Sequence, residues 1–204
     1  MPLWAIIPVK PLRRGKSRLS AVLTEDERTT LNQNMLTNTL KTLTSVDRID
    51  TIMVVSRDPG ALTLAREFGA RTVLENGSPE LNTALRRAAT VAKTYQANEI
   101  LIIPADLPLV TREVIEEFLG KSGTPPEIII SPDRRKDGTN MLYVSPAGLI
   151  QFSYGIGSFA KHVSQAEQYG ARIEIIESEQ LGLDLDLPED LELLRKIQEL
   201  SSSN

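Results

Sequence analysis

The chain has no cysteine and only one histidine, His162. The lack of cysteine excludes thiol nucleophiles, zinc–thiolate sites, iron–sulfur clusters and disulfides. A single histidine argues against a multi-histidine metal site and a histidine-based catalytic triad, and we expect His162 on the surface or on one face of a helix. Any chemistry must therefore depend on carboxylates, amines, hydroxyls and backbone groups.

Long apolar segments and an excess of basic charge are also missing. No run approaches the roughly 20 apolar residues that a membrane-spanning helix needs, and the N-terminus does not have the pattern of a signal peptide. The 23 basic and 27 acidic residues give a net charge of -4, and only 4% of the residues are aromatic. This composition lacks the basic surface and the stacking aromatics of nucleic-acid-binding proteins. We expect a cytoplasmic protein with neither a membrane nor a nucleic acid as partner.

What the chain does contain is typical of a globular protein. Its 204 residues are 41% hydrophobic and 25% charged, which fits one domain with a substantial core. We therefore expect a single domain over residues 1–204, in which only the last four residues, 201–204, form a frayed tail.

Apolar runs and amphipathic segments alternate along the chain. Short apolar runs predict strands at residues 3–7, 50–56, 71–74, 99–103, 127–131, 140–144 and 172–176, the first of them stopped by Pro8. Capping signals and helical periodicity predict helices from Thr24, with Glu27 completing a capping box, after Asp58-Pro59, after Ser78-Pro79, and over residues 111–119, 157–168 and 188–200. This alternation predicts an α/β fold with a doubly wound, mostly parallel sheet covered on both faces. In such sheets, ligands bind beyond the carboxyl ends of the strands.

The first predicted strand is followed by a basic loop, PVKPLRRGKSRL at residues 8–19. Its cations include Lys10, Lys16 and Arg18, and they lie where the fold rule places a ligand. The run Gly15-Lys16-Ser17 looks like the end of a Walker A motif, but that motif needs a glycine at position 10, which is lysine. A receiver domain is disfavoured because it needs acidic residues after its first strand. We interpret the loop as a site for nucleotide phosphates, with a solvated basic loop as the alternative.

Aspartates stand at two other places in the predicted sheet. Asp106 follows the strand at 99–103, where an unpaired buried carboxylate would be costly, so we expect it to bind a metal, accept hydrogen bonds or cap the next helix. Alternation places Asp184 and Asp186 on the same face of an extended segment, although Asp186 also fits the N-cap of the last helix. Glu189 and Asp190 are assigned to the dipole of that helix. Two carboxylates of this cluster together with Asp106 would suit Mg²⁺, a hard cation that prefers oxygen ligands.

Two glycine-containing turns complete the polar set. The first, DGTN at residues 137–140, delivers the Thr139 hydroxyl at the start of a strand. The second, YGIGSF at residues 154–159, leads into a helix N-terminus, which is a ready anion site but also an ordinary way to begin a helix. The cations at 134–136 either reach a phosphate or are solvated.

Taken together, the PVKPLRRGKSRL loop, the PADLPL strand end, DGTN, the GxGSF turn and LDLDLPEDL resemble one group of nucleotidyltransferases. That group is the 2-phospho-L-lactate / phosphoenolpyruvate guanylyltransferase family of deazaflavin coenzyme F-420 biosynthesis. The resemblance covers essentially the whole chain, with the motifs in the family's order. Leu187 departs from the threonine that is common in the wider superfamily, at a position that should carry no chemistry. The resemblance implies one nucleotidyltransferase domain of GT-A-like, Rossmann-like type.

The resemblance also implies a reaction and the residues that serve it. GMP would be transferred from GTP to the phosphate of phosphoenolpyruvate or 2-phospho-L-lactate in a Mg²⁺-dependent step that releases pyrophosphate. Thr139, Gly155 and Ser158 would bind the acceptor phosphate, and Asp106, Asp184 and Asp186 would hold Mg²⁺. Lys10, Lys16, Arg18 and Asn82 would bind the nucleotide, with Lys16 and Asp106 as the catalytic residues, and the segment 76–82 is similar to a loop that contacts base and ribose. A homodimer is compatible with the resemblance.

Three alternatives are open. Another nucleotidyltransferase of this fold, acting on the molybdenum cofactor or a sugar phosphate, would carry a glycine-rich loop after its first strand, which this chain lacks. A non-catalytic binding domain would not need aspartates at two strand ends, and a nucleic-acid-binding module is disfavoured by composition. The residues themselves lead only to a Mg²⁺-dependent enzyme acting on a nucleotide. Guanine and the three-carbon acceptor are implied by the resemblance alone.

Overall fold

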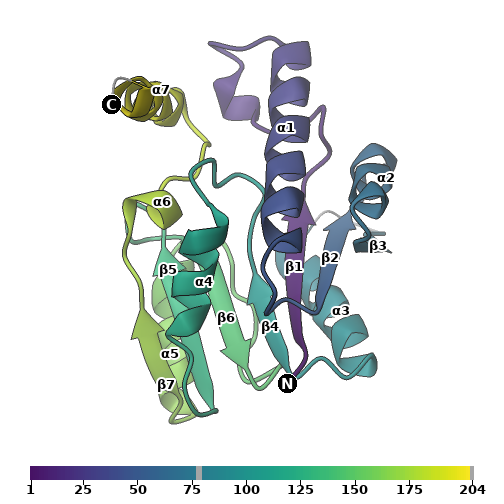
Figure 1. The fold of residues 1–204 in the computed structure, drawn as a ribbon, viewed down its shortest axis with the longest axis vertical. Helices are drawn as coiled ribbons and strands as arrows, with labels where there is room; N and C mark the ends of the chain where they lie inside the picture. Colours follow the sequence, from purple (N-terminus) through teal and green to yellow (C-terminus); the bar gives the residue numbers. More distant parts are fainter. Residues whose placement is uncertain (77–79, 203–204) are drawn as a thin grey trace.

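The computed structural model describes residues 1–76 and 80–202, with side chains up to residue 200. Its centre is a seven-stranded sheet in the order β3-β2-β1-β4-β6-β5-β7 (Figure 1). The strands are β1 (Leu3–Val9), β2 (Thr51–Ser56), β3 (Arg71–Leu74), β4 (Glu99–Ile102), β5 (Glu127–Pro132), β6 (Thr139–Ser145) and β7 (Arg172–Ile175). All of them coincide with predicted strands to within two residues at either end.

The sheet is mostly parallel, as predicted. β1 pairs in parallel with β2 and β4, β2 with β3, and β5 with β7, whereas β6 runs antiparallel to both of its neighbours. Only residues 133–138 separate β5 from β6, and a parallel pair needs a crossover connection of about a dozen residues or more. The short gap between the two predicted strands was therefore the sequence signal for this reversal.

Helices cover both faces of the sheet (Figure 1). The helices α1 (Glu25–Thr44), α2 (Pro59–Glu67) and α4 (Arg112–Gly120) share one core cluster with residues such as Leu36, Leu62 and Phe118. The helices α3 (Leu81–Thr94) and α5 (Ser158–Gln168) contribute Leu85 and Ala166 to the cluster on the other face. This burial on both faces explains why the central strands read as nearly continuous apolar runs.

Capping residues fix most of the helix starts. Thr24 and Glu27 form the predicted capping box of α1, and Asp58 caps α2 with Pro59 in the first turn. The N-cap of α4 is Thr111, so the expectation that Asp106 caps this helix is wrong. In α3 the N-cap is Glu80, and the predicted start at residues 78–79 lies outside the described residues.

The expectation that Pro8 stops the first strand is wrong. β1 continues to Val9, and Pro8 and Val9 are in register with Val55 and Ser56 of β2. The carbonyl of Ile6 accepts from Ile103 N–H on the β4 side, and alternation places the nitrogen of Pro8 on that same side, beyond the end of β4. The proline therefore removes no ladder hydrogen bond, because no strand faces its nitrogen.

Three short or terminal elements lie near the carboxyl ends of the parallel strands. The 3₁₀ helix η1 (Ser17–Leu19) and the helix α6 (Glu179–Gly182) were not predicted, because they are too short to show periodicity. The last helix, α7 (Pro188–Ser202), lies above the sheet in Figure 1 and packs through Leu194 against Leu185 and Met35. It continues into the predicted tail, of which residues 203–204 lie outside the described residues.

None of the helices in the described part of the chain combines the length and the apolar character that crossing a membrane would require.

Candidate active site

The basic loop after β1 is held by two polar side chains. Asp58 Oδ2 accepts a hydrogen bond from Leu12 N–H at 2.7 Å, and Asn32 Nδ2 donates to the Leu12 carbonyl at 2.7 Å. Because Asp58 caps α2 and Asn32 belongs to α1, the loop is fixed against both helices. A Cβ on Gly15 would lie 2.6 Å from Asn32 Nδ2, so a larger residue there would push the Asn32 amide away from the Leu12 carbonyl.

Lys16 turns from this loop towards the aspartates. Its backbone is left-handed, with φ 57°, a conformation that is costly for a residue with a Cβ atom and that concentrates at functional sites. Its side chain is only 7% exposed, with Nζ 2.5 Å from Asp106 Oδ2 and 3.7 Å from Asp186 Oδ1. Arg18, in η1, places NH1 2.8 Å from the other oxygen of Asp186. The structure thus brings together cations and carboxylates from both ends of the chain.

The segment that carries Asp184 and Asp186 is anchored by Asp106 and Asn140. Leu185 N–H donates to the Asp106 carbonyl at 3.0 Å. The side-chain amide of Asn140 donates to the carbonyls of Leu181 and Gly182, at 2.8 and 3.2 Å. The segment pairs with no strand of the described sheet, and Asp186 N–H bonds to the Asp184 carbonyl at 3.1 Å. Both aspartates line one cleft.

Asp190, rather than Asp186, satisfies the backbone at the start of α7. Its Oδ2 accepts from the N–H groups of Asp186 and Leu187, at 3.2 and 2.7 Å. The Asp190 side chain is almost buried and pairs with Arg134 at 3.0 Å. The Asp186 carboxylate is therefore available to Lys16 and Arg18.

Asp184 lies in an environment that disfavours its negative charge. Burial, and then the negative charge of Asp106, raises the pKa of Asp184 above its usual value. No three acidic or histidine side chains of the described residues lie close enough to hold a metal ion by themselves. Mg²⁺, however, binds through one or two carboxylates together with waters and substrate phosphates. The oxygen donors of Asp106, Asp184 and Asp186 therefore fit this ion without forming a closed cage.

The glycine-rich turn at residues 154–158 is fixed at both ends. At one end, Asn82 Oδ1 accepts from Tyr154 N–H at 2.7 Å, and Asn82 Nδ2 donates to the Tyr154 carbonyl at 3.1 Å. At the other end, Asp137 Oδ1 accepts from Gly157 N–H at 3.1 Å. Gly155 and Gly157 have φ values of 114° and 69°, which only glycine adopts readily. The turn therefore presents Ser158 at the N-terminus of α5 in one defined position.

The turn opens onto a cleft of about 400 Å³. The predicted site residues that line it are Arg18, Thr139, Gly155, Ser158, Asp184 and Asp186. Lys16 and Asp106 join this group through their contacts with the acidic segment, and Asn82 joins it through Tyr154. Lys10 is exposed at the end of β1 and is not part of this lining.

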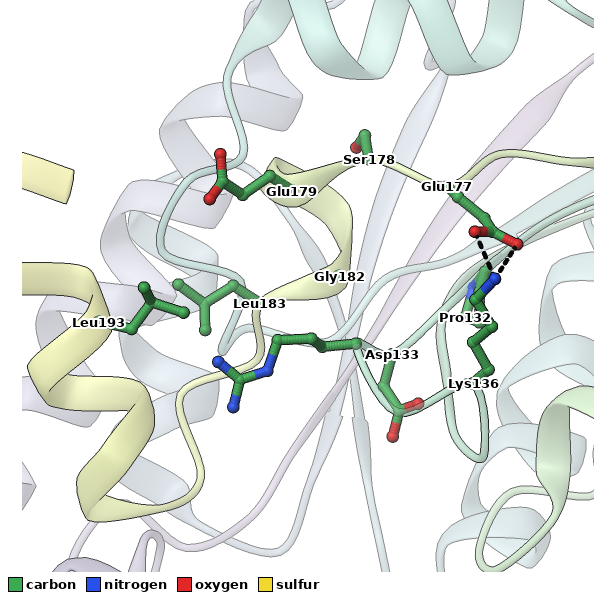
Figure 2. Close-up of a pocket in the computed structure, with 10 residues that line it drawn as sticks. Pro132, Asp133, Lys136, Glu177, Ser178, Glu179, Gly182, Leu183 and Leu193 are labelled. Atoms are coloured by element: carbon green, nitrogen blue, oxygen red, sulfur yellow. Dashed lines mark hydrogen bonds and ion pairs between the residues drawn. The ribbon is translucent and has the colours of Figure 1, made fainter.

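A second hollow of about 420 Å³ lies beside the cleft. The two share Asp133, Arg134, Gly182 and Leu183 in their walls. Within this hollow Lys136 reaches Glu177 at 2.7 Å (Figure 2), and nearby Arg135 pairs with Glu189 at 2.6 Å. The cations at 134–136 thus make ion pairs that join the β5–β6 turn to the C-terminal segment.

Sequence reasoning missed three side chains that shape this region. His162 lies on α5 but is fully buried rather than on the surface, with Nδ1 3.0 Å from Thr139 Oγ1. Its spacing of four residues from Ser158 was the available signal, because residues i and i+4 share a helix face. The sequence carried no such signal for the anchoring roles of Asn140 and Asp190. Asn140 binds backbone atoms of a segment that is distant in the sequence. Asp190 binds backbone N–H groups just before α7, a contact that helical periodicity does not reveal.

Comparisons with known proteins show the family of this chain. Residues 3–198 match the family model described as "Guanylyl transferase CofC like". Phosphoenolpyruvate guanylyltransferase from Rubrobacter xylanophilus is 39% identical over 94% of this chain and 92% of its own length. 2-phospho-L-lactate guanylyltransferase from Methanocaldococcus jannaschii is 38% identical over 91% of this chain and 79% of its own. A nucleotidyl transferase from Methanothermobacter shares the fold, with a TM-score of 0.69 at 15% identity over 100% of this chain and 99% of its own. The chain belongs to the CofC-like guanylyl transferase family.

Proposed function

We propose that this protein transfers GMP from GTP to the phosphate of phosphoenolpyruvate or 2-phospho-L-lactate and releases pyrophosphate, in coenzyme F-420 biosynthesis. The observation that carries the proposal is a single cleft lined by two kinds of residues. Thr139, Gly155 and Ser158 supply hydroxyls and a glycine-rich turn suited to a phosphate, and Asp184, Asp186 and Arg18 line the same space. The names of the relatives support the two acceptors, and phosphoenolpyruvate is the one we would test first.

The proposed chemistry needs no general base. The attacking group is a phosphate oxygen of the acceptor, which is already an anion. It forms a bond to the α-phosphorus of GTP while the bond from that phosphorus to the bridging oxygen of the β-phosphate breaks, and pyrophosphate leaves with the electron pair. Catalysis then depends on positioning and on neutralising charge. This accounts for an enzyme without cysteine and with a single histidine.

We assign the residues as follows. Thr139, Gly155 and Ser158 hold the acceptor phosphate. Lys16 and Arg18 neutralise the triphosphate, and Lys10, at the exposed end of β1, extends this positive surface. Asn82 is proposed as a nucleotide contact, and its amide also holds Tyr154.

The carboxylates of Asp106, Asp184 and Asp186 are proposed to hold Mg²⁺. When bound, the ion would neutralise the phosphate oxygens and orient them for displacement. The raised pKa of Asp184 supports this assignment, since it reflects a buried site with too much negative charge. We also propose a cytoplasmic location and a homodimer, the latter to be checked by light scattering.

The test is pyrophosphate release by the purified protein with Mg²⁺ and GTP. Parallel arms contain phosphoenolpyruvate, 2-phospho-L-lactate or no acceptor, and a downstream enzyme traps a labile adduct. Acceptor-dependent release with GTP, and little with ATP or CTP, would support the proposal and identify the acceptor. Release that requires the molybdenum cofactor or a sugar phosphate instead would assign the chain to another nucleotidyltransferase activity. Removal of Mg²⁺ with EDTA, followed by its restoration, tests the metal.

A further inference from the structure

His162 is the buried centre of a short hydrogen-bonded chain. Its side chain is fully buried on α5, one turn after Ser158. The ring nitrogen Nε2 lies 2.9 Å from Ser153 N, and Nδ1 lies 3.0 Å from Thr139 Oγ1. Tyr154 packs edge-on against the imidazole, with ring centroids 5.1 Å apart, so the ring is held in place by contacts on several sides.

These partners assign the tautomer of the imidazole. The backbone N–H of Ser153 can only donate, so Nε2 must offer its lone pair. In the neutral ring the proton then sits on Nδ1 and is donated to Thr139 Oγ1. Burial, and then the charge of Lys161, lowers the pKa of His162 to about 4, so this neutral form is the one present near neutral pH.

The tautomer determines how many hydroxyl protons face the cleft. Ser158 Oγ donates a hydrogen bond to Thr139 Oγ1 at 3.2 Å, which uses one of the two hydroxyl protons of the pair. Because Nδ1–H donates a hydrogen bond to Thr139 Oγ1, the other hydroxyl proton of the pair is not used inside the protein and can be donated to a ligand. If the ring carried its proton on Nε2 instead, Nδ1 would accept from Thr139 and both hydroxyl protons would be used inside the protein. A phosphate would then face only lone pairs.

We propose that His162 is a positioning residue whose Nδ1–H donates a hydrogen bond to Thr139 Oγ1. As a result, the Thr139–Ser158 pair directs one hydroxyl proton at the acceptor phosphate. The inference rests on the proposed function for the identity of this ligand. The histidine itself touches no reacting atom. It acts through the two hydroxyls, which are 6% and 1% exposed and line the cleft.

The first experiment uses the wild-type protein without any histidine tag, because His162 is the only histidine of the chain. Long-range ¹H–¹⁵N NMR then reports one imidazole without ambiguity. The expected spectrum is that of the neutral Nδ1–H tautomer from pH 6 to 8, with signals that shift when inorganic phosphate or phosphoenolpyruvate is added. An Nε2–H tautomer, a titration near the usual histidine pKa, or signals that respond to neither anion would overturn the proposal.

The second experiment compares two substitutions that each keep half of the hydrogen bonding. His162→Asn can place an amide N–H where Nδ1–H lies, and His162→Gln can place a carbonyl oxygen where Nε2 lies. We expect His162→Gln to raise the KM for the acceptor about tenfold or more, the usual worth of a hydrogen bond to a charged group. The KM for GTP should change little, and His162→Asn should recover most of the acceptor affinity.

A purely structural role predicts a different pattern. It would make the two variants equally impaired, or would raise both KM values together, and either result contradicts the proposal. Circular dichroism confirms that each variant is folded, and the NMR experiment needs no variant at all. If the wild-type protein releases no pyrophosphate with either acceptor, the proposed function fails, while the tautomer and the response to inorganic phosphate still decide the role of His162.

Discussion

Lys16 Nζ lies 2.5 Å from Asp106 Oδ2, although the two residues are 90 positions apart in the sequence. The lysine comes from the loop after β1 and the aspartate from the loop after β4, and these two strands are parallel neighbours. The pair therefore exists because the carboxyl ends of adjacent parallel strands meet at one edge of the sheet. It joins the basic loop after β1 to the loop after β4.

Replacing Asp106 with asparagine removes one charge and keeps the size of the side chain. We expect Asp106→Asn to reduce acceptor-dependent pyrophosphate release by about 100-fold or more, since it removes the charge that pairs with Lys16 and that is proposed to hold Mg²⁺. The fold should survive, because Asp106 caps no helix and its carbonyl still accepts from Leu185 N–H.

Asp47→Asn is the matched control for that variant. Asp47 is 94% exposed and pairs with Arg112 outside the cleft, so the activity of the Asp47→Asn variant should equal that of the wild type. Substantial activity in Asp106→Asn, measured at the same Mg²⁺ concentration, would remove Asp106 from the metal site.

Lys16 combines a side chain that is proposed to bind the triphosphate with an unfavourable backbone conformation. Lys16→Ala and Lys16→Gly both remove the ammonium group, and we expect kcat to fall by about 100-fold in each. Their stabilities should differ, because alanine is strained at a φ of 57° and glycine is not. Glycine should be the more stable variant by about 0.5–1 kcal/mol after allowance for its greater entropy when unfolded.

Thermal unfolding measures that difference, which corresponds to about 2 °C in Tm for a chain of this size. Equal Tm values would show that the loop relaxes out of the left-handed conformation once the contact with Asp106 is lost. An unchanged kcat in both variants would make Lys16 a structural residue.

Replacing Asn82 distinguishes two roles for this residue, support of the glycine-rich turn and direct contact with the nucleotide. Both atoms of its amide bond to the backbone of Tyr154, so Asn82→Ala should loosen the turn that carries Gly155 and Ser158. We expect the KM for the acceptor to rise by several-fold to tenfold, as for the loss of one or two hydrogen bonds. Steady-state kinetics in each substrate provide the measurement. A rise in the KM for GTP as well would support the proposed contact with the nucleotide, and a rise confined to the KM for the acceptor would remove Asn82 from the nucleotide site.

The fold was largely predictable because its signals are local or periodic. The apolar runs located the strands, and the capping box at Thr24 located α1. The apolar run that located β6 carries no information on its direction, and the signal for the reversal was the short connection from β5. The prediction for Pro8 was wrong because a proline removes a ladder hydrogen bond only where a strand faces its nitrogen. The sheet order, which the sequence does not give, decides this.

The candidate site was predictable in its chemistry but not in its geometry. Charged residues after β1 and β4 and in the segment 183–190 could be found from their positions in the pattern. The contact of Lys16 with Asp106 needs a left-handed lysine, which no propensity indicates. The importance of His162 was missed because a lone histidine in a helix says nothing about burial until its partners on neighbouring strands and loops are known.

His162 also predicts a specific dependence of stability on pH. Burial lowers the pKa of His162 to about 4 from its ordinary value of 6.5, so between these values the unfolded chain binds more protons than the folded chain. The free energy of unfolding therefore increases with pH across this interval, and the contribution of His162 is lost as the pH falls from 6.5 towards 4. At full extent this contribution is about 3 kcal/mol.

Carboxylates also titrate in that interval, so the informative quantity is the difference between the wild type and a variant that cannot bind the proton. We expect the wild type to lose more stability than His162→Asn as the pH falls from 6.5 to 4, in urea unfolding at each pH. His162→Gln should give the same slope, because neither amide titrates. Lys161→Gln should weaken the effect, since the charge of Lys161 contributes to the lowered pKa. If the difference in the free energy of unfolding between wild type and variant did not change over this range, the folded protein would bind a proton at His162 as readily as the unfolded chain does. A buried ring whose Nε2 faces Ser153 N–H cannot do this, so that result would contradict the prediction.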